Sequence, residues 1–271
     1  MTAPIRVTGA TRLYAIMGDP IAQVRSPEVF SARFADAGIN AVVVPWHVPG
    51  ERFDAIVPAL LSLGNLDGVL VTVPFKARMA AFASRLGKAA ECIGAVNALR
   101  READDSWTGD MCDGIGFVGG AERKGERLRG RRGALFGAGG AGSAIACALA
   151  GAGVAAIDVI DVDRSKAEML VQRLTSAFPE CAVAAASSMR DDIDLVVNAS
   201  PIGMRPGDGL PGDIPPLDAG TLIGDVVIAD APTPIIRHAM RCGCRWIDGR
   251  DMHGGQVDAI MAFLSASRPA R

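Results

Sequence analysis

The sequence predicts an α/β protein of two domains. Its 271 residues are nearly half apolar and carry both signs of charge, which is enough to bury one or two cores without external cross-links. Short β-rich runs alternate with amphipathic stretches in the first half of the chain, and a second alternation begins near Trp107. Length and pattern together predict two domains of roughly 130 residues each.

In the first half, β-rich runs predict strands at residues 13–17, 41–46 and 68–73. Ser26 before Pro27 reads as an N-cap followed by proline at the first helical position, so a helix is expected from about Pro27. A second helix is expected from about Glu51, after Pro49 and Gly50.

The second half reads as successive βα units. Strands are expected at residues 134–136, 156–160 and 195–198, with helices from about Gly140 and over 164–177. The polar segment 100–106 is interpreted as the linker between the halves. We therefore expect one domain at 1–105 plus 250–271, with a final helix from about Gln256 packing back on it, and a second domain at 106–249.

Composition limits the partners and the compartment. The formal net charge is −2 and the charges are interspersed, so no basic stripe is present that would follow a nucleic acid backbone. The first residues show no apolar core that ends in a cleavage site, so the cytoplasm is expected. Residues 133–157 carry no charge and exceed bilayer length, but their glycines favour a strand, turn, helix and strand over a membrane span.

The cysteines are spread through apolar surroundings and are interpreted as reduced core thiols. Cys242 and Cys244 form a lone C-x-C motif, and His238 is the only imidazole close to it in sequence. Because a structural zinc site needs four ligands, no metal is expected.

A glycine-rich turn follows the apolar run at 134–136 and precedes a helical stretch, which is the context of a dinucleotide-binding turn. The first glycine permits the tight turn, the second lets the backbone approach a pyrophosphate, and the last lets the helix pack close to the strand. The turn consists of Gly137, Ala138, Gly139, Gly140, Ala141 and Gly142. The second domain is therefore predicted to be a Rossmann-like NAD(P)-binding domain.

Asp161 ends the next apolar strand, where an acidic residue accepts hydrogen bonds from the adenosine ribose. This placement favours NAD over NADP, although Arg164 is close enough in sequence to pair with a 2′-phosphate. Asp161 could instead cap the helix that begins near Arg164. An adenosylmethionine-dependent methyltransferase would present a similar turn and acid, and it remains an alternative at this point.

Several segments in collinear order resemble the shikimate and quinate dehydrogenase family. The resemblance covers nearly the whole chain, and no single motif is unique to the family. The matching segments are Ser26-Pro27, 71–76 (VTVPFK), 94–97 (GAVN), 113–116 (DGIG), the glycine turn, 198–204 (NASPIGM), Thr233-Pro234 and 249–256. The resemblance implies an N-terminal α/β substrate domain, a C-terminal Rossmann-like domain and a place in aromatic amino acid biosynthesis.

The resemblance assigns catalysis to Lys76 and Asp113. Oxidising a secondary alcohol needs a hydride acceptor and a group that takes the hydroxyl proton, and a lysine beside a carboxylate suits the second task. The residues themselves also allow a purely structural ion pair.

The remaining site residues are also carried over from the family. Ser26 would contact a substrate carboxylate, while Thr72, Asn97 and Gln256 would bind substrate hydroxyls. On the cofactor side, the resemblance adds Asn198, Ser200, Met204 and Gly249.

The chain departs from the family pattern at five positions. Val24 and Ile228 replace a serine and a tyrosine that supply hydroxyl groups, Leu70 replaces an asparagine, and Met111-Cys112 replaces Asn-Thr. Two charged hydrogen bonds of about 1.5–3 kcal/mol each would be lost unless Arg25 or Arg250 replaces them. We therefore expect weak or absent shikimate turnover.

The function predicted from the sequence is NAD-preferring, reversible oxidation of a cyclic polyol or hydroxy acid. The alternative is a catalytically idle protein of the same fold that binds a dinucleotide and a metabolite. Either a monomer or a homodimer is compatible with the sequence.

Overall fold

The computed structural model describes residues 7–266 and divides into two compact units. Among these residues, the first unit runs to Met111 and includes the chain from Ile260, and the second spans Cys112–Ala259. The expected division at 105/106 and 249/250 differs because residues after 105 form a strand of the first sheet and because the second division falls within the last helix. No helix in the described range is long and apolar enough to cross a bilayer.

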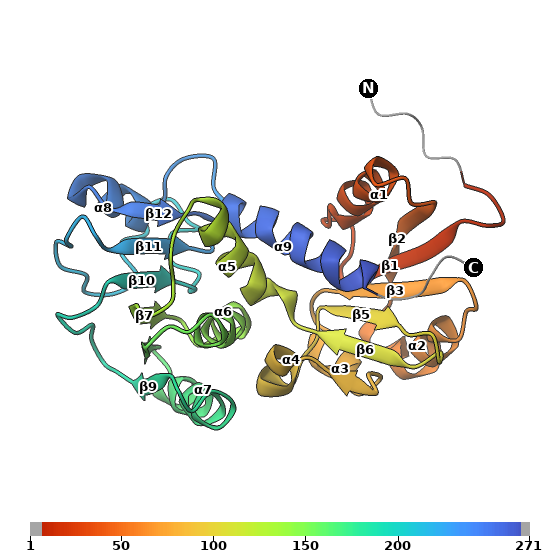
Figure 1. The fold of residues 1–271 in the computed structure, drawn as a ribbon, viewed down its shortest axis with the longest axis horizontal. Helices are drawn as coiled ribbons and strands as arrows, with labels where there is room; N and C mark the ends of the chain where they lie inside the picture. The colour runs from red at the N-terminus through yellow and green to blue at the C-terminus, as the bar shows by residue number, and fades with distance from the viewer. Residues whose placement is uncertain (1–6, 267–271) are drawn as a thin grey trace. The chain divides into compact units, whose positions relative to one another are not determined.

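The first unit contains a six-stranded sheet in the order β2-β1-β3-β5-β6-β4 (Figure 1). The strands β1, β2 and β3 are parallel, while β5 is antiparallel to both β3 and β6. The strands span Arg12–Gly18 (β1), Ala41–His47 (β2), Leu66–Val71 (β3), Arg85–Leu86 (β4), Ala98–Arg101 (β5) and Trp107–Asp110 (β6). The helices of this unit are α1 (Ser26–Asp36), the 3-10 turn η1 (Gly50–Arg52), α2 (Phe53–Leu61), α3 (Lys76–Ala80) and α4 (Lys88–Ile93).

Two expectations about this unit are wrong. Helix α1 begins at Ser26 with Arg25 at the N-cap position, and no side chain caps it, so Ser26 is not the cap. The segment 100–106 is the turn of a β-hairpin and not a linker, because Arg100 and Arg101 pair with β6. Arg101 donates hydrogen bonds to the carbonyl oxygens of Leu63 and Leu66, which lets a charged residue lie inside the sheet.

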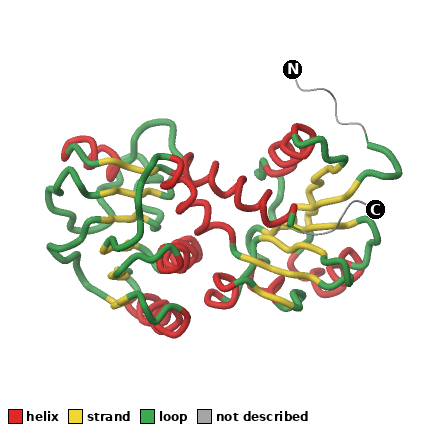
Figure 2. Tube along the Cα trace, viewed as in Figure 1, coloured by secondary structure: helices red, strands yellow, loops and turns green. Residues whose placement is uncertain are grey.

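The second unit contains a parallel sheet in the order β12-β11-β10-β7-β8-β9. The strands span Arg132–Phe136 (β7), Ala156–Ile160 (β8), Ala182–Ala185 (β9), Leu195–Asn198 (β10), Leu222–Asp225 (β11) and Arg245–Ile247 (β12). The helices are α5 (Cys112–Arg123), α6 (Gly140–Gly151), α7 (Arg164–Ala177), α8 (Pro234–Cys242) and α9 (Gly249–Ser265), the last of which continues past Ala259. The segment between β10 and β11 forms neither helix nor strand (Figure 2).

The two-domain α/β fold predicted from the sequence is confirmed. The uncharged stretch 133–157 forms β7, α6 and the start of β8, as interpreted from its glycines. The final helix begins at Gly249, earlier than the expected Gln256. Its last turn packs on the first sheet, where Arg100 donates a hydrogen bond of 2.8 Å to the carbonyl oxygen of Phe263.

Helix α5 was not predicted, because its sequence CDGIGFVGGAER is rich in glycine, a weak helix former. Its glycines permit close packing against α6: a Cβ at Gly114 would lie 1.9 Å from the carbonyl oxygen of Ala144. Tertiary packing therefore overrides the local preference of this segment.

Gly114→Ala is expected to destabilise the protein by at least about 2 kcal/mol, because backbone must move to admit the methyl group. Gly119→Ala on the same helix is the matched control, since its Cβ would have only an ordinary contact at 3.7 Å. The control should be neutral or more stable by about 0.5–1 kcal/mol. Denaturant unfolding measures both, and equal stability of the two variants would contradict this account of α5.

Candidate functional site

The glycine turn joins β7 to α6 and has the backbone geometry that the sequence predicted. Gly137 has a φ of +101°, and a Cβ there would lie 2.9 Å from the main chain of Ala199 and Ser200. A Cβ at Gly142 would lie 1.9 Å from the carbonyl oxygen of Gly137. Both positions therefore exclude any larger residue, and they bring the start of α6 tightly against the end of β7.

The outer part of this turn is open. Gly139, the N-cap of α6, and Gly140 are exposed, and a Cβ at either position would meet no atom within 4 Å. The first amide groups of a helix have no partner within the helix and carry the positive end of its dipole. An open helix N-terminus without side chains is suited to a pyrophosphate, so the residues present fit a dinucleotide.

Asp161 follows β8 and is bound to the glycine turn. One of its carboxylate oxygens accepts a hydrogen bond of 2.6 Å from the Ala138 amide, and the other accepts one of 2.8 Å from the Asp163 amide. The cap of α7 is Asp163, which accepts from the Ser165 amide, so the reading of Asp161 as that cap is wrong. Asp161 is thus fixed beside the turn.

Arg164 is exposed at the start of α7 and forms an ion pair with a residue of the same helix. Its Nε lies 2.8 Å from Glu168 Oε1, a pair in which both side chains are more than half exposed. Such a pair contributes little and can be exchanged for another anion.

The loop after β10 begins with Asn198, which is 1% exposed. Its Nδ2 donates to the Ile202 carbonyl oxygen and to Asp225 Oδ1, both at 2.9 Å, and its Oδ1 accepts from the amide and hydroxyl of Ser200. Protein groups thus occupy this side chain and hold the start of the loop, and Met204 further along the loop is exposed. Gly249 is the first residue of α9, and a Cβ at this position would lie 2.7 Å from the Val226 carbonyl oxygen.

In the first unit, the structure brings Thr72, Lys76 and Asn97 into one neighbourhood. The Thr72 amide donates to the Met17 carbonyl oxygen, the Val71 amide donates to that of Asn97, and the Val96 amide donates to that of Lys76. Lys76 is the first residue of α3 and follows Phe75, whose buried ring lies 4.8 Å from that of Phe53. Because the Phe75 ring is anchored in the core, the backbone position of the neighbouring Lys76 is fixed.

Ser26 is half-buried and is the first residue of α1 in the same unit. The loop that leads to it does approach the group above, because a Cβ at Gly18 would meet both Ile21 and Thr72.

In the second unit, the structure joins two predicted residues directly. Gln256 Nε2 on α9 donates a hydrogen bond of 2.5 Å to Asp113 Oδ1 on α5, and both residues are partly exposed. The carboxylate that the resemblance assigns to catalysis is therefore oriented by an amide from a second helix.

Comparison with known proteins gives the family. Residues 16–99 match the family described as the shikimate dehydrogenase substrate binding domain. The shikimate dehydrogenase (NADP(+)) of Rubrobacter xylanophilus is 36% identical over 259 residues, 93% of this chain and 89% of that relative. The chain belongs to the shikimate dehydrogenase family.

Solved structures agree with this membership. Shikimate 5-dehydrogenase from Listeria monocytogenes, solved with shikimate and NAD, has a TM-score of 0.87 at 26% identity and covers 100% of this chain and 96% of its own. The 5-ketofructose reductase of Gluconobacter sp. strain CHM43 has a TM-score of 0.85 at 25% identity and covers 97% and 96%. The predicted family and dehydrogenase class are confirmed, and the methyltransferase alternative is wrong.

The departures from the family pattern fall into two kinds in this member. Leu70 and Met111 are each 3% exposed, so these replacements belong to the interior and do not enlarge an accessible apolar surface. Ile228 is 63% exposed, and Val24 is half-buried in the loop that leads to α1. Of these four side chains, only those of Val24 and Ile228 are accessible.

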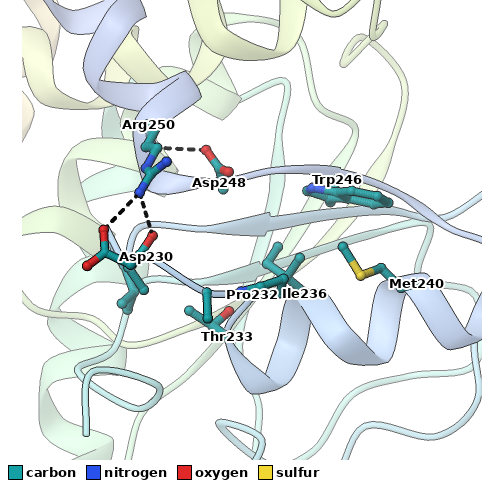
Figure 3. A pocket seen from close by; sticks show the side chains of 11 residues that line it. Asp230, Pro232, Thr233, Ile236, Met240, Trp246, Asp248 and Arg250 are labelled. Carbon is teal, nitrogen blue, oxygen red and sulfur yellow. Dashed lines mark hydrogen bonds and ion pairs between the residues drawn. The ribbon is translucent and has the colours of Figure 1, made fainter.

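The two arginines considered above as replacements for the lost hydroxyl groups have partners of their own. Arg25 pairs with Glu28 at 2.7 Å. Arg250 donates to the Ala229 carbonyl oxygen and to Asp230, beside a pocket also lined by Thr233 and Trp246 (Figure 3).

Sequence reasoning missed Asp19, which follows β1, and His47, which is the last residue of the neighbouring strand β2. His47 Nε2 lies 3.0 Å from one carboxylate oxygen of Asp19, and the Gly50 amide donates to the other at 3.1 Å. These two hydrogen bonds lower the pKa of Asp19. The Asp19 amide also donates to the Val73 carbonyl oxygen, just before Lys76. Their position at the carboxyl ends of parallel strands was the signal available in the sequence.

The cysteine motif forms no metal cluster within the residues described. Cys242 Sγ lies 3.7 Å from His238 Nε2, whereas Cys244 Sγ donates to the Asp218 carbonyl oxygen at 3.3 Å. Three or more metal-binding side chains do not converge anywhere in the described range.

Proposed function

We propose that this chain catalyses the reversible NAD(P)-dependent oxidation of a secondary alcohol on a shikimate- or quinate-like ring, and that shikimate itself is a poor substrate. The observation that carries the proposal is the open glycine turn beside a fixed Asp161, in a chain that keeps Lys76 and Asp113. Relatives named shikimate dehydrogenase and a neighbour solved with shikimate and NAD support it.

The chain's own residues would divide the work between binding and proton transfer. Amides at the start of α6 would hold the pyrophosphate, and the bound nicotinamide would supply the hydride acceptor. Lys76 would take the proton of the substrate hydroxyl, with Asp113 as its charged partner, and Thr72 and Asn97 would bind other hydroxyls. Gln256 would keep the Asp113 carboxylate in one orientation through its hydrogen bond.

We further propose that NAD is preferred to NADP. The Asp161 carboxylate is fixed by two amides, so a 2′-phosphate beside it would meet an unfavourable charge. The Rubrobacter relative is named as an NADP(+) enzyme, so the preference separates this chain from it.

Asp161→Asn is expected to shift the ratio of kcat/KM for NAD to that for NADP toward NADP by about tenfold or more, since a tenfold change needs only about 1.4 kcal/mol. Asp191→Asn, an exposed carboxylate elsewhere in this unit, is the control and should leave the ratio unchanged. Wild-type preference for NADP would overturn the proposal for NAD and leave the dehydrogenase proposal intact.

The substrate proposal rests on Val24 and Ile228. Neither side chain can donate a hydrogen bond, so a carboxylate bound there would lose two ligands. One structural neighbour is named as a reductase of 5-ketofructose, a sugar without a carboxylate. This name supports a substrate that lacks a carboxylate.

Restoring the hydroxyl groups tests this interpretation. Val24→Ser with Ile228→Tyr is expected to raise kcat/KM for shikimate at least tenfold, if each charged hydrogen bond is worth about 1.5–3 kcal/mol. Val24→Ala with Ile228→Phe changes size without adding a donor and should not raise it. A gain in the control pair equal to that in the hydroxyl pair would mean that pocket size, and not hydrogen bonding, limits turnover.

A further inference from the structure

A completely buried carboxylate lies at the end of β11 and takes no part in the function proposed so far. Asp225 is 0% exposed. Burial raises its pKa and the nearby charge of Asp248 adds to the effect, while hydrogen bonds to the carboxylate act in the opposite direction. A buried carboxylate is costly unless its oxygens are bound, so the segments that bind it are informative.

Three segments donate to Asp225. Oδ1 accepts from Asn198 Nδ2 at 2.9 Å and from the Val227 amide at 3.1 Å, and Oδ2 accepts from the hydroxyl of Thr233. Thr233 is itself 5% exposed and precedes α8 at its N-cap position. Asn198, Asp225 and Thr233 are called the buried triad below.

The buried triad fixes two loops at the carboxyl edge of the sheet. Through Asn198 it holds the loop after β10, since the same amide group binds both Ser200 and Ile202. Through the Val227 amide and Thr233 it holds both ends of the loop 226–233. The outer side of that second loop is held separately by Arg250 (Figure 3).

The order of the strands indicates which part of a dinucleotide the loop after β10 and the loop 226–233 would face. Asp161 follows β8, on one side of β7 and its glycine turn, whereas β10 and β11 lie on the other side. With the adenosine ribose at Asp161 and the pyrophosphate at the turn, the nicotinamide half would extend over the ends of β10 and β11.

We propose that Asp225 is a positioning residue for the nicotinamide half of the cofactor, acting through the two loops that the buried triad holds. This inference rests on the proposed function, because it requires that the chain bind a nicotinamide dinucleotide. Asp225 has no exposed atom to offer a ligand, so its effect is transmitted by the main chain of those loops.

Calorimetric titration with NADH and with ADP-ribose, which lacks the nicotinamide, separates the two halves of the site. Asp225→Asn is expected to weaken NADH binding about tenfold or more and to change ADP-ribose binding less than about twofold. Asp191→Asn is the control, because this exposed carboxylate of the same unit lies outside both loops, and it should alter neither affinity.

Thr233 supplies a second pair of variants in case Asp225→Asn does not fold. Thr233→Val removes the hydroxyl donor at nearly constant shape and should reproduce the selective loss of NADH binding. Thr233→Ser keeps the donor and should bind NADH as the wild type does. Parallel losses for NADH and ADP-ribose, or no loss for either, would overturn the inference alone. A wild-type protein that binds neither NADH nor NADPH would overturn the proposed function as well.

Discussion

Lys76→Met is expected to lower kcat by about 10²–10⁴-fold while leaving the affinity for NAD nearly unchanged, because general acid–base catalysis contributes about that factor. Methionine keeps an unbranched chain of similar length but cannot accept or donate the proton. Lys76 is the first residue of α3 in the first unit, whereas the glycine turn belongs to the second unit. Steady-state kinetics at 340 nm, together with calorimetric titration of NAD, measure the two effects separately.

Lys88 offers a matched control for this substitution. It is also the first residue of a short helix of the first unit, α4, and it is exposed. Lys88→Met should keep kcat within about twofold of wild type, since it removes the same charge without removing the proposed proton acceptor. If Lys76→Met retained full activity, the assignment of proton transfer to this lysine would be wrong.

Gly142→Ala is expected to abolish measurable dinucleotide binding and to lower the melting temperature. Its methyl group would overlap the Gly137 carbonyl oxygen, at 1.9 Å, so the turn between β7 and α6 must open. Overpacking of this kind costs about 1–3 kcal/mol or more, and the displaced amides would no longer converge on a pyrophosphate.

Two further alanine variants distinguish folding from binding. Gly139→Ala meets no protein atom within 4 Å, so it should keep the melting temperature but weaken NADH binding, because the methyl group would stand where the pyrophosphate approaches. Gly151→Ala at the end of α6 has only an ordinary contact with Phe178 at 3.6 Å and should change neither quantity. Normal NADH binding by Gly139→Ala would place the dinucleotide away from this turn.

The elements with a clear local pattern were predicted well from the sequence. Strand β8 and helix α7 have the predicted bounds, because an apolar run and a helical period with an acidic N-cap define them without tertiary help. Helix α5 and the start of α9 were missed, because their glycines serve helix packing, which a local pattern does not reveal.

The candidate site divides in the same way. The glycine turn and Asp161 were recognisable because their chemistry lies within one βαβ unit. The buried triad joins residues 198, 225 and 233 through a sheet register that only the folded structure provides. Likewise, the sequence did not show that Leu70 and Met111, two of the departures from the family pattern, are buried in the interior.

The central claim is that this chain is an active nicotinamide-dependent dehydrogenase whose substrate has diverged from shikimate. Absorbance at 340 nm tests it most directly, with NAD or NADP and a panel of shikimate, quinate, amino-substituted analogues and carboxylate-free cyclic alcohols. The account predicts turnover of at least one panel member other than shikimate, faster with NAD, and lost in Lys76→Met. Cofactor binding without turnover across the panel would favour the catalytically idle protein, and efficient use of shikimate would contradict the proposed divergence.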